Sequence, residues 1–268
     1  MKLESGQFID HSRKLLKVSG LDAKKFLQGI ITNDINKSFS SLIYSGLLSP
    51  QGKYLFDFFI NGLDEENFII DIDTDSYKDF LNRLNLYKLR SNVLFSDIES
   101  SVILGFGDKI NDSFYDPRSH MLGWRKFSFQ TLDKNKNNDE DTFFKKYELK
   151  RIDLCIPKSG YELKSGETYI LETNFDKING VSFTKGCFVG QEVTARMRHK
   201  TTLKNGIIKF QSTTDELKLN NIITNEDGKK VGRISSFLNK KGLAVIQFIY
   251  AKGKLYCEEN EIKILYIN

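Results

Sequence analysis

Apolar and polar residues alternate through the first hundred positions in short runs that are separated by Gly, Pro, Asn and Asp. Apolar runs between such turn residues predict strands, and runs with an apolar residue every three to four positions predict helices. Ser-Pro-Gln-Gly-Lys at 49–53 predicts the turn of a hairpin. The predicted strands are 13–20, 42–48, 54–60 and 68–72, and the predicted helices are 21–30, with Asp22 as its N-cap, and 77–89.

The pattern changes in the second half of the chain. A charged stretch at 131–141 has no apolar period, which predicts a surface loop or linker. A helix is expected over 143–152 and should end before Pro157, because the residue preceding a proline is pushed out of the α region. Apolar and polar residues alternate at 193–198, which predicts a half-buried strand rather than a helix. Further predicted strands are 93–95, 101–105, 206–210, 230–234, 243–250 and 261–267.

The order of these elements predicts an α+β fold. Strand, helix, strands and helix follow one another before residue 100, as in a unit with an antiparallel sheet. From about residue 200 the short alternating runs are typical of a small β-barrel or sandwich. A chain of 268 residues exceeds what one compact core usually holds. We therefore expect an α+β region at 1–199 and a small β-barrel at 200–268.

Composition and charge narrow the class of protein. Hydrophobic residues make up 40 % of the chain and aromatic residues 12 %, which excludes disorder over most of its length. A formal net charge of +5 is too small to indicate nucleic-acid binding, and no apolar stretch is long enough for a membrane span. The N-terminus lacks an Arg-rich, acid-poor leader, so the expected location is the cytoplasm and the expected partners include neither nucleic acid nor membrane.

Three cysteines are scattered along the chain outside any Cys-x-x-Cys pattern, which predicts neither disulfides nor a zinc site. Cys187 stands between Gly186 and Gly190 and follows Lys185 closely. Positive neighbours favour the thiolate, so Cys187 is either a reactive thiol or soft metal ligand, or a buried free cysteine. Because a cluster held by one chain normally needs four ligands, any iron–sulfur cluster bound here would be shared or transient.

Two other groups of residues have a plain structural interpretation. Cys155 and Cys257 lie in apolar settings and are expected to be structural. In the predicted strand at 193–198, Arg196 and Arg198 would share one face, where two guanidinium groups can hold a carboxylate, although a solvated strand face would carry the same residues.

One segment carries a family resemblance. Residues 185–192 read Lys-Gly-Cys-Phe-Val-Gly-Gln-Glu, which resembles the hallmark of the YgfZ family of folate-binding proteins, with Phe188 in place of the usual tyrosine. That family is a branch of the fold shared with the aminomethyltransferase (T-protein) of the glycine cleavage system. Cys155 stands where the family usually has glycine. Further similar segments are 18–22, 26–29, 32–34, 48–53, 116–118, 122–124, 151–157, 171–176 and 180–183.

The resemblance implies a T-protein-like folate-binding region around a central pocket, closed by a C-terminal β-barrel, with tetrahydrofolate as the ligand. Glu172 corresponds to a pocket carboxylate, which could accept the adjacent N–H groups of a pterin, although a surface glutamate is the plainer interpretation. By the same resemblance the functional thiol is Cys187, and the residues expected to contact the cofactor are Arg13, Tyr147, Glu172, Lys185, Gln191, Glu192 and Arg196.

The function implied is that of an accessory factor that uses tetrahydrofolate and Cys187 to assemble or repair iron–sulfur clusters in client enzymes, including those that thiolate tRNA. Its partners would be folate and the client enzymes or cluster carriers. The alternative is a folate-dependent one-carbon (aminomethyl) transferase, in which Asp57 would be the acid–base residue. Because the paired acids of the aminomethyltransferases are reduced here to Asp57 alone, methylene transfer is not the leading interpretation. A third possibility is an interaction module without a ligand.

Overall fold

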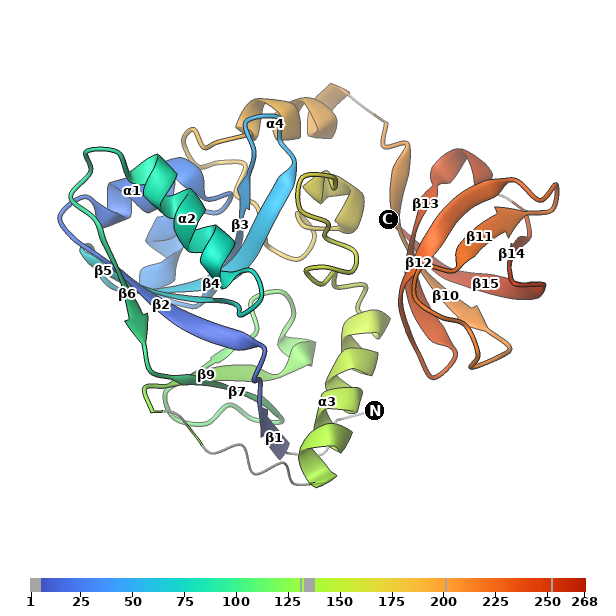
Figure 1. Cartoon of the computed structure of the whole chain (residues 1–268), viewed down its shortest axis with the longest axis horizontal. Coiled ribbons are helices and arrows are strands. Elements are labelled where there is room, and N and C mark those ends of the chain that lie inside the picture. The colour runs from blue at the N-terminus through green and yellow to red at the C-terminus, as the bar shows by residue number, and fades with distance from the viewer. Residues whose placement is uncertain (1–5, 131, 133–137, 201, 252) are drawn as a thin grey trace.

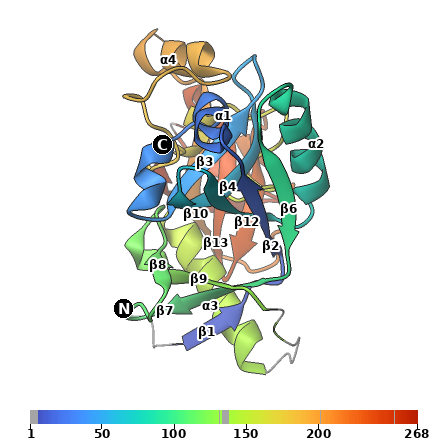
Figure 2. The ribbon, with the colours of Figure 1, turned by 90° about the vertical axis from the view of Figure 1, so that its left-hand side faces the viewer.

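The computed structural model describes residues 6–130, 132, 138–200, 202–251 and 253–268. Within these residues, two antiparallel sheets form the N-terminal part and a closed barrel forms the C-terminal part, with the long helix α3 and an irregular segment between them (Figure 1). The two sheets lie one above the other when the molecule is turned (Figure 2). This arrangement confirms the predicted α+β fold with a C-terminal barrel.

The first sheet has the strand order β3-β4-β5-β2-β6, and the second has the order β1-β7-β9-β8. Helices α1 and α2 cover one face of the first sheet, and the second sheet shares a core with its other face. The strands are β1 (Gly6–Ile9), β2 (Arg13–Ser19), β3 (Ile43–Leu48), β4 (Tyr54–Asp64), β5 (Asn67–Asp73), β6 (Leu94–Ile98), β7 (Ser101–Phe106), β8 (Ser113–Tyr115) and β9 (Trp124–Ser128), and the helices are α1 (Ala23–Ile30) and α2 (Tyr77–Lys88).

Strands β2 and β5 are apolar at most positions because both faces of their sheet are covered. In β2, Leu15 packs into the core between the sheets, whereas Leu16 packs under the helices. In β5, Ile69 and Ile70 divide in the same way. Successive side chains of a strand point to opposite faces, so a strand in the middle layer needs apolar residues at adjacent positions. The apolar residues at adjacent positions of β2 and β5 therefore match a sheet that lies between the helices on one side and the second sheet on the other.

Helix α3 (Asn138–Asp153) ends at a residue with left-handed backbone geometry. Cys155 has a φ of 54°, and its N–H donates to the carbonyl of Ile152. A helix that ends in this way usually has glycine at the left-handed position, because other side chains clash there. The glycine found at this place in the resembled family therefore has a conformational reason. Pro157 follows, as expected for a helix end.

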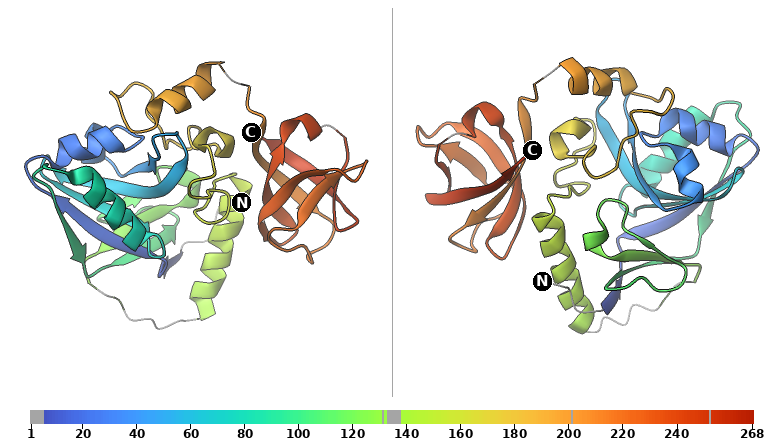
Figure 3. Two further views of the ribbon diagram at one scale, coloured as in Figure 1. Left: turned by 45° about the horizontal axis from the view of Figure 1, so that its top comes forward. Right: turned by 180° about the vertical axis from the view of Figure 1, so that it is seen from behind.

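The C-terminal barrel has the strand order β10-β13-β12-β11-β14-β15 and its own apolar interior. The barrel lies beside α3 (Figure 3), and it meets this helix through a small apolar contact and through a buried polar group. Arg151 Nη1 lies 3.3 Å from Glu162 Oε2, and the hydroxyl of Ser236 bridges both residues at 2.8 and 2.6 Å. The barrel strands are β10 (Asn205–Ser212), β11 (Ile222–Asn225), β12 (Lys230–Leu238), β13 (Lys241–Gln247), β14 (Leu255–Cys257) and β15 (Asn260–Ile267).

Short elements complete the chain. The 3-10 helices are η1 (Ile35–Phe39), η2 (His120–Leu122), η3 (Ile170–Thr173) and η4 (Phe248–Tyr250), and helix α4 (Gln191–Lys200) precedes the barrel. Among the helices of the described residues, none is long and apolar enough to cross a bilayer.

Most predicted elements lie where the pattern placed them, and four predictions need correction. The strand predicted at 243–250 ends at Gln247, because Phe248–Tyr250 form η4. The loop predicted at 131–141 is wrong at its end, because α3 begins at Asn138, and residues 131 and 133–137 lie outside the described residues. Asp22 precedes α1 but makes no side-chain cap, since its carboxylate accepts the N–H of Asn92 instead. The strand predicted at 193–198 is also wrong, because those residues belong to helix α4.

Candidate functional site

A buried group of aspartates and arginines lies between the two sheets. Asp71, on β5, is fully buried and accepts Arg13 Nε on one carboxylate oxygen at 2.6 Å and Arg125 Nη1 on the other at 2.5 Å. Arg13 begins the neighbouring strand β2, and Arg125 comes from β9 in the other sheet. Charges taken out of water are tolerated only when they are paired in this way. Asp71 therefore joins the two sheets by an ion-paired contact.

A second ion pair continues this group. Asp116 and Arg118 form a bidentate pair, with Nη2 of the guanidinium 2.7 Å from the carboxylate, and the same Nη2 donates to the hydroxyl of Tyr147 on α3 at 2.7 Å. Although burial alone would raise it, the pKa of Asp116 is lowered by Arg118 and Arg125. Arg125 Nε lies 3.6 Å from Asp116 and has no hydrogen-bond partner among the described residues.

The three guanidinium groups surround a single aromatic ring. Their central carbons lie 3.8 Å (Arg125), 4.9 Å (Arg118) and 5.5 Å (Arg13) from the centroid of the Phe59 ring on β4. A cation within about 6 Å of a ring centroid is attracted by the ring quadrupole. Phe59 thus contacts all three arginines, and we call this set, together with Asp71 and Asp116, the central cluster.

Asp57 lies on the same strand as Phe59 and accepts two tyrosine hydroxyls. Tyr44 donates to one carboxylate oxygen at 2.9 Å, and Tyr54 donates to the other at 2.6 Å. Burial raises the pKa of both phenols well above the ordinary value, and the negative charge of Asp57 adds to that effect. The phenols therefore stay protonated and act as hydrogen-bond donors to the carboxylate.

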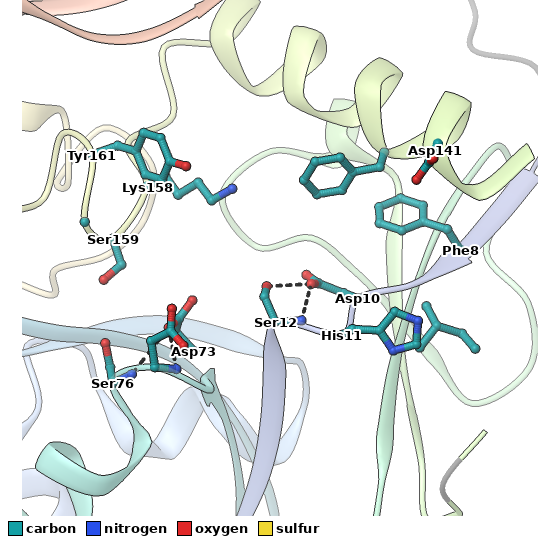
Figure 4. Close-up of a pocket in the computed structure, with 14 residues that line it drawn as sticks. Phe8, Asp10, His11, Ser12, Asp73, Ser76, Asp141, Lys158, Ser159 and Tyr161 are labelled. Carbon is teal, nitrogen blue, oxygen red and sulfur yellow. Dashed lines mark hydrogen bonds between the residues drawn. The ribbon is translucent and has the colours of Figure 1, made fainter. Parts of the chain in front are cut away.

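Two pockets open beside these residues. The first has a volume of about 460 Å³ and lies where the turn between β1 and β2 and the end of β5 face α3 and the loop at 158–161 (Figure 4). Phe8 and Tyr161 contribute rings to its wall, and the close-up shows Asp10 and Asp73 on one side and Lys158 on the other. The side chain of Ser159, which also lines this pocket, bonds to the hydroxyl of Tyr54 at 3.1 Å. The first pocket is therefore adjacent to Tyr54, one of the two donors to Asp57.

The second pocket has a volume of about 470 Å³ and includes Tyr44, the other donor of Asp57. It is formed by η1, the start of β3, the residues around β8 and residues 179–181. Pockets of this size are typical of sites for small organic ligands. Asp57 thus has one tyrosine donor connected to each pocket.

The hallmark segment 185–192 lies in front of α4 and is held at its start by a lysine. Lys185 is buried and donates to the carbonyl oxygens of Gln28 at 2.6 Å and Ile31 at 2.7 Å, where α1 ends. A cation at the C-terminus of a helix is favoured by the helix dipole. Burial lowers the pKa of Lys185 to about 8. Lys185 therefore fastens this segment to α1.

Two glycines hold the other end of the hallmark segment. Gly190 has a φ of 82°, and a Cβ there would stand 2.7 Å from the carbonyl oxygen of Ser49 and 3.1 Å from the Cα of Gly52. Gly52 has a φ of 75° in the turn of the β3–β4 hairpin, and a Cβ on it would meet Val193 at 2.7 Å. Glycine is needed at both positions because the two backbones touch. Cys187, between these attachments, is exposed.

Because residues 191–200 form a helix, the direction of the arginine side chains differs from the prediction. Arg196 and Arg198 are both exposed, and residues two apart on a helix do not face the same direction. The predicted shared strand face is therefore wrong. The guanidinium carbon of Arg198 lies 3.7 Å from the centroid of Phe183. Gln191, partly buried, and Glu192, exposed, form the first turn of α4.

Glu172 lies apart from the central cluster. It is part of η3, and its carboxylate accepts Asn205 Nδ2 at 3.4 Å, where the barrel begins. Burial raises the pKa of Glu172. Among the predicted residues, the structure thus brings Arg13, Tyr147 and Asp57 to the space between the sheets, whereas Glu172 lies at the barrel.

The remaining predicted residues gather elsewhere. Lys185, Cys187, Gln191 and Glu192 share the hallmark segment and the start of α4, and Arg196 lies one turn farther along that helix. The roles assigned to all of these residues stay predictions.

The sequence interpretation missed most of the central cluster. Asp116 and Arg118 were noticed only as part of a similar segment, and Asp71 and Arg125 were not noticed. One signal was present: Asp71 stands inside the apolar run Phe-Ile-Ile-Asp-Ile, where a buried strand is expected to have no charge. Cys155 and Cys257 are buried as expected, and burial raises the pKa of each thiol to about 11.

Comparisons with known proteins place the chain among its relatives. None of the searched protein-family models matches it. It is 35 % identical over 225 residues to the "Iron-sulfur cluster assembly factor IBA57 homolog, mitochondrial" of Neurospora crassa, which covers 74 % of this chain and 51 % of that protein. It is 26 % identical over 283 residues to the IBA57 of Homo sapiens, covering 93 % of this chain and 79 % of that one. The chain is thus similar in sequence to the IBA57 factors.

The chain spans about half the length of the IBA57 homologues that match it at the higher identities, such as the 57 % covered in the Dictyostelium discoideum protein at 32 % identity. The IBA57 relatives named here are mitochondrial. The predicted cytoplasmic location is contradicted by these names and is wrong.

A solved structure supports the fold. The aminomethyltransferase T of the glycine cleavage system from Bartonella henselae superimposes with a TM-score of 0.76 over 99 % of this chain and 86 % of that one, at 12 % identity. The predicted T-protein-like fold is thereby confirmed.

Proposed function

We propose that this chain is an iron–sulfur cluster assembly factor, as its IBA57 relatives are named, in which Cys187 is the thiol that contacts the cluster. The observation that carries the proposal is the setting of this cysteine. Cys187 is exposed, while its segment is held to α1 by Lys185 and to the β3–β4 hairpin by Gly190. A fixed and accessible thiol can contact a cluster presented by another protein.

The other cysteines do not serve this role. Cys155 and Cys257 are buried and their pKa values of about 11 keep them as thiols, whereas a metal ligand is a thiolate. A cluster normally takes four protein ligands. The cluster in this proposal is therefore shared, with the remaining ligands supplied by a cluster carrier or a client enzyme.

The second part of the proposal is that tetrahydrofolate binds between the sheets, beside Asp57. The residues present fit this ligand. Asp57 and its tyrosines offer a carboxylate of the kind that pairs with the N–H groups of a pterin, rings line both pockets, and Arg125 Nε is a buried donor without a hydrogen-bond partner in the described part of the chain. Arg13, which pairs with Asp71, and Tyr147, which accepts a hydrogen bond from Arg118, belong to the neighbouring polar network, and the proposal keeps both as ligand contacts.

The proposal also takes its location and clients from the relatives. Since the IBA57 proteins matched are mitochondrial, we place this chain in a mitochondrion. Its clients would be iron–sulfur enzymes of that compartment, with tRNA-thiolating enzymes among the candidates.

The test of the thiol uses two cysteine variants in cells that lack the endogenous factor. Cys187→Ser removes the exposed thiol, and Cys155→Gly is the control, because it removes a buried thiol at a position of positive φ that glycine accepts. We expect Cys187→Ser to lose the activity of an iron–sulfur client enzyme and Cys155→Gly to retain it, with both proteins folded by thermal melting. Full client activity with Cys187→Ser would remove the thiol from the proposal.

The test of the ligand is calorimetric titration with tetrahydrofolate. Asp57→Asn should weaken binding about tenfold, because an amide cannot replace the negative acceptor. Glu172→Ala decides the prediction made from the resemblance. Loss of binding would put Glu172 in the pocket, and unchanged binding would remove it.

The aminomethyltransferase alternative has less support. The paired acids of the aminomethyltransferases are reduced here to Asp57, and in the structure both of its oxygens accept tyrosine hydroxyls. Production of methylenetetrahydrofolate from a lipoyl-bound aminomethyl donor by the purified protein would favour the enzyme.

A further inference from the structure

A hollow lies between α1 and the turn that follows α2. Its volume is about 870 Å³, and it is in the part of the molecule far from the barrel, where both helices lie (Figure 1). Phe26 and Ile30 contribute apolar side chains to its lining, and nothing stands within 4 Å of the position that a Cβ would take at Gly29. We call it the α1–α2 hollow, and its lining residues are Asp22, Lys25, Phe26, Gly29, Ile30, Leu89, Arg90 and Ser91.

The turn after α2 has a leucine at a position that favours glycine. The N–H of Ser91 donates to the carbonyl of Lys88, and Leu89, at the second position of this turn, has a φ of 46° and a ψ of −111°. These angles belong to the second position of a type II′ turn, where glycine predominates because it has no Cβ. The side chain of Leu89 is also 86 % exposed. Neither the backbone conformation nor the exposure favours folding, so Leu89 points to a contact with another molecule.

Two basic side chains stand beside the apolar part of the α1–α2 hollow. Lys25 and Arg90 are exposed, and neither forms an ion pair with another described residue. The one carboxylate among the lining residues is that of Asp22, which accepts the backbone N–H of Asn92. The surface that complements the hollow is therefore apolar, with negative charges at its edge.

The shape of the α1–α2 hollow favours a helix as its occupant. Its lining residues come from α1, from Asp22 directly before that helix and from the turn after α2, and none of them belongs to a strand. An added strand would need a free sheet edge, whereas an amphipathic helix packs its apolar face into a groove. The flat surface of a membrane would leave the hollow unfilled, and unfilled space loses packing contacts.

The α1–α2 hollow is connected to the segment that carries Cys187. Lys185, at the start of the hallmark segment, donates to two backbone carbonyls at the end of α1. Val189, from the same segment, packs against the core cluster that contains Phe26 and Ile30. A molecule bound in the hollow is therefore attached to the helix that also anchors the segment of the thiol.

We propose that the α1–α2 hollow docks an acidic amphipathic helix of the protein that presents the cluster to Cys187. This rests on the proposed function, because it assigns the surface by which the partner of the same thiol is held. Apolar side chains on one face of that helix pack on Leu89 and Phe26. Carboxylates at the edge of the same face pair with Lys25 and Arg90.

The first experiment measures binding of two synthetic peptides to the full chain by fluorescence anisotropy. The acidic peptide has leucine at every third or fourth position and glutamate on its other faces, and the basic peptide has lysine in place of each glutamate. Both are about 15 residues long, the length at which isolated helices begin to be stable. The wild type should bind the acidic peptide roughly tenfold more tightly than the basic one. Equal affinities, or no binding of the acidic peptide, would overturn the proposal.

Variants of the leucine test the apolar contact. Leu89→Gly should weaken binding of the acidic peptide about tenfold, because one apolar contact is lost. Leu86→Ala is the control, since Leu86 is exposed on the same helix but does not line the hollow, and it should bind as the wild type does. Leu89→Gly should also raise the urea midpoint, because glycine accepts the turn conformation. A fall in that midpoint would show that Leu89 serves the fold and would overturn the proposal.

Charge reversal tests the basic side chains. Lys25→Glu/Arg90→Glu should abolish the preference for the acidic peptide, whereas the control Lys78→Glu/Lys230→Glu should keep it. The control makes the same change in net charge at exposed lysines that do not line the hollow. An equal loss in the control would overturn the proposal, because the effect would then be one of net charge.

The second experiment measures the activity of an iron–sulfur client enzyme in cells that lack the endogenous factor. Leu89→Gly should lower that activity, and Leu86→Ala should not. Full activity with Leu89→Gly, together with loss in Cys187→Ser, would overturn the docking surface and leave the proposed function intact. The proposed function fails by a different result, which is full activity with Cys187→Ser.

A membrane is the other occupant that the experiments detect. The wild type and Leu89→Gly are sedimented with vesicles of phosphatidylcholine and cardiolipin. Binding of the wild type that is lost in Leu89→Gly, without binding of the acidic peptide, would assign the surface to a membrane and overturn the proposal.

Discussion

Substitution of Gly190 by alanine tests whether the hallmark segment is held by direct backbone contact with the β3–β4 hairpin. Two effects act at this position. The φ of 82° lies in the left-handed region, and an added Cβ would stand 2.7 Å from the carbonyl oxygen of Ser49, with Leu48 Cβ at 3.0 Å. Neither neighbour is the end of a flexible side chain, so the segment must move away from the hairpin.

The two effects can be separated with other glycines of the chain. Gly160 has a φ of 77° and nothing within 4 Å of its Cβ position, so Gly160→Ala measures the backbone effect alone, about 1–2 kcal/mol. Overpacking of a close contact adds about 1–3 kcal/mol, so we expect Gly190→Ala to cost roughly 2–5 kcal/mol. Gly186 is in the same segment with open space and no positive φ, and Gly186→Ala should change the free energy of unfolding by less than about 1 kcal/mol.

Urea denaturation of the three variants gives these free energies, and the rate of alkylation of Cys187 by iodoacetamide reports on the segment itself. Displacement of the segment should change that rate in Gly190→Ala and leave it unchanged in Gly160→Ala. If Gly190→Ala costs no more than Gly160→Ala and alkylates at the wild-type rate, the hairpin does not hold the segment, and the argument for a fixed thiol is refuted.

Two other predictions concern buried charges. Asp71→Asn leaves Arg13 and Arg125 without their carboxylate and should cost about 3–5 kcal/mol in urea denaturation; a cost below about 1 kcal/mol would show that the central cluster is not coupled to stability. The pKa of Lys185 is lowered from 10.5 to about 8 in the folded state, so between these values the unfolded chain keeps a proton that the folded chain has lost. Its contribution to the stability of the folded state should therefore rise with pH from about 8 to 10.5, and Lys185→Met, titrated with urea at both pH values, should lack that rise.

The elements of the fold were largely predictable because their signals are local. The hairpin at Ser49–Lys53 and the barrel strands β10, β12, β13 and β15 follow from turn residues and alternation within a few positions, whereas the short strands β11 and β14 were not predicted. Helix α4 was missed because six residues of alternation are too few to decide between strand and helix. Contacts outside the window decide it instead: Gly190 turns the chain, and Val193 packs on Gly52.

The candidate site was predictable only in part because its pairs are distant in sequence. The hallmark segment could be read directly, since its residues are adjacent. Asp71 and its partner Arg125 lie 54 residues apart and come from different sheets, and no local pattern connects them. The charges around Phe59 were therefore visible as single residues but not as a cluster, whereas an aspartate inside an apolar strand was the signal that could have been followed.

The polar contact between α3 and the barrel has a consequence for the order in which the chain folds as it is synthesised. Arg151 and Glu162 are made early, whereas Ser236 follows 85 residues after Arg151. Until the strand that contains Ser236 emerges, the two charges face water, where an ion pair needs no further partner. A growing chain therefore presents charge rather than an entirely apolar surface at this position, which limits aggregation before the barrel docks.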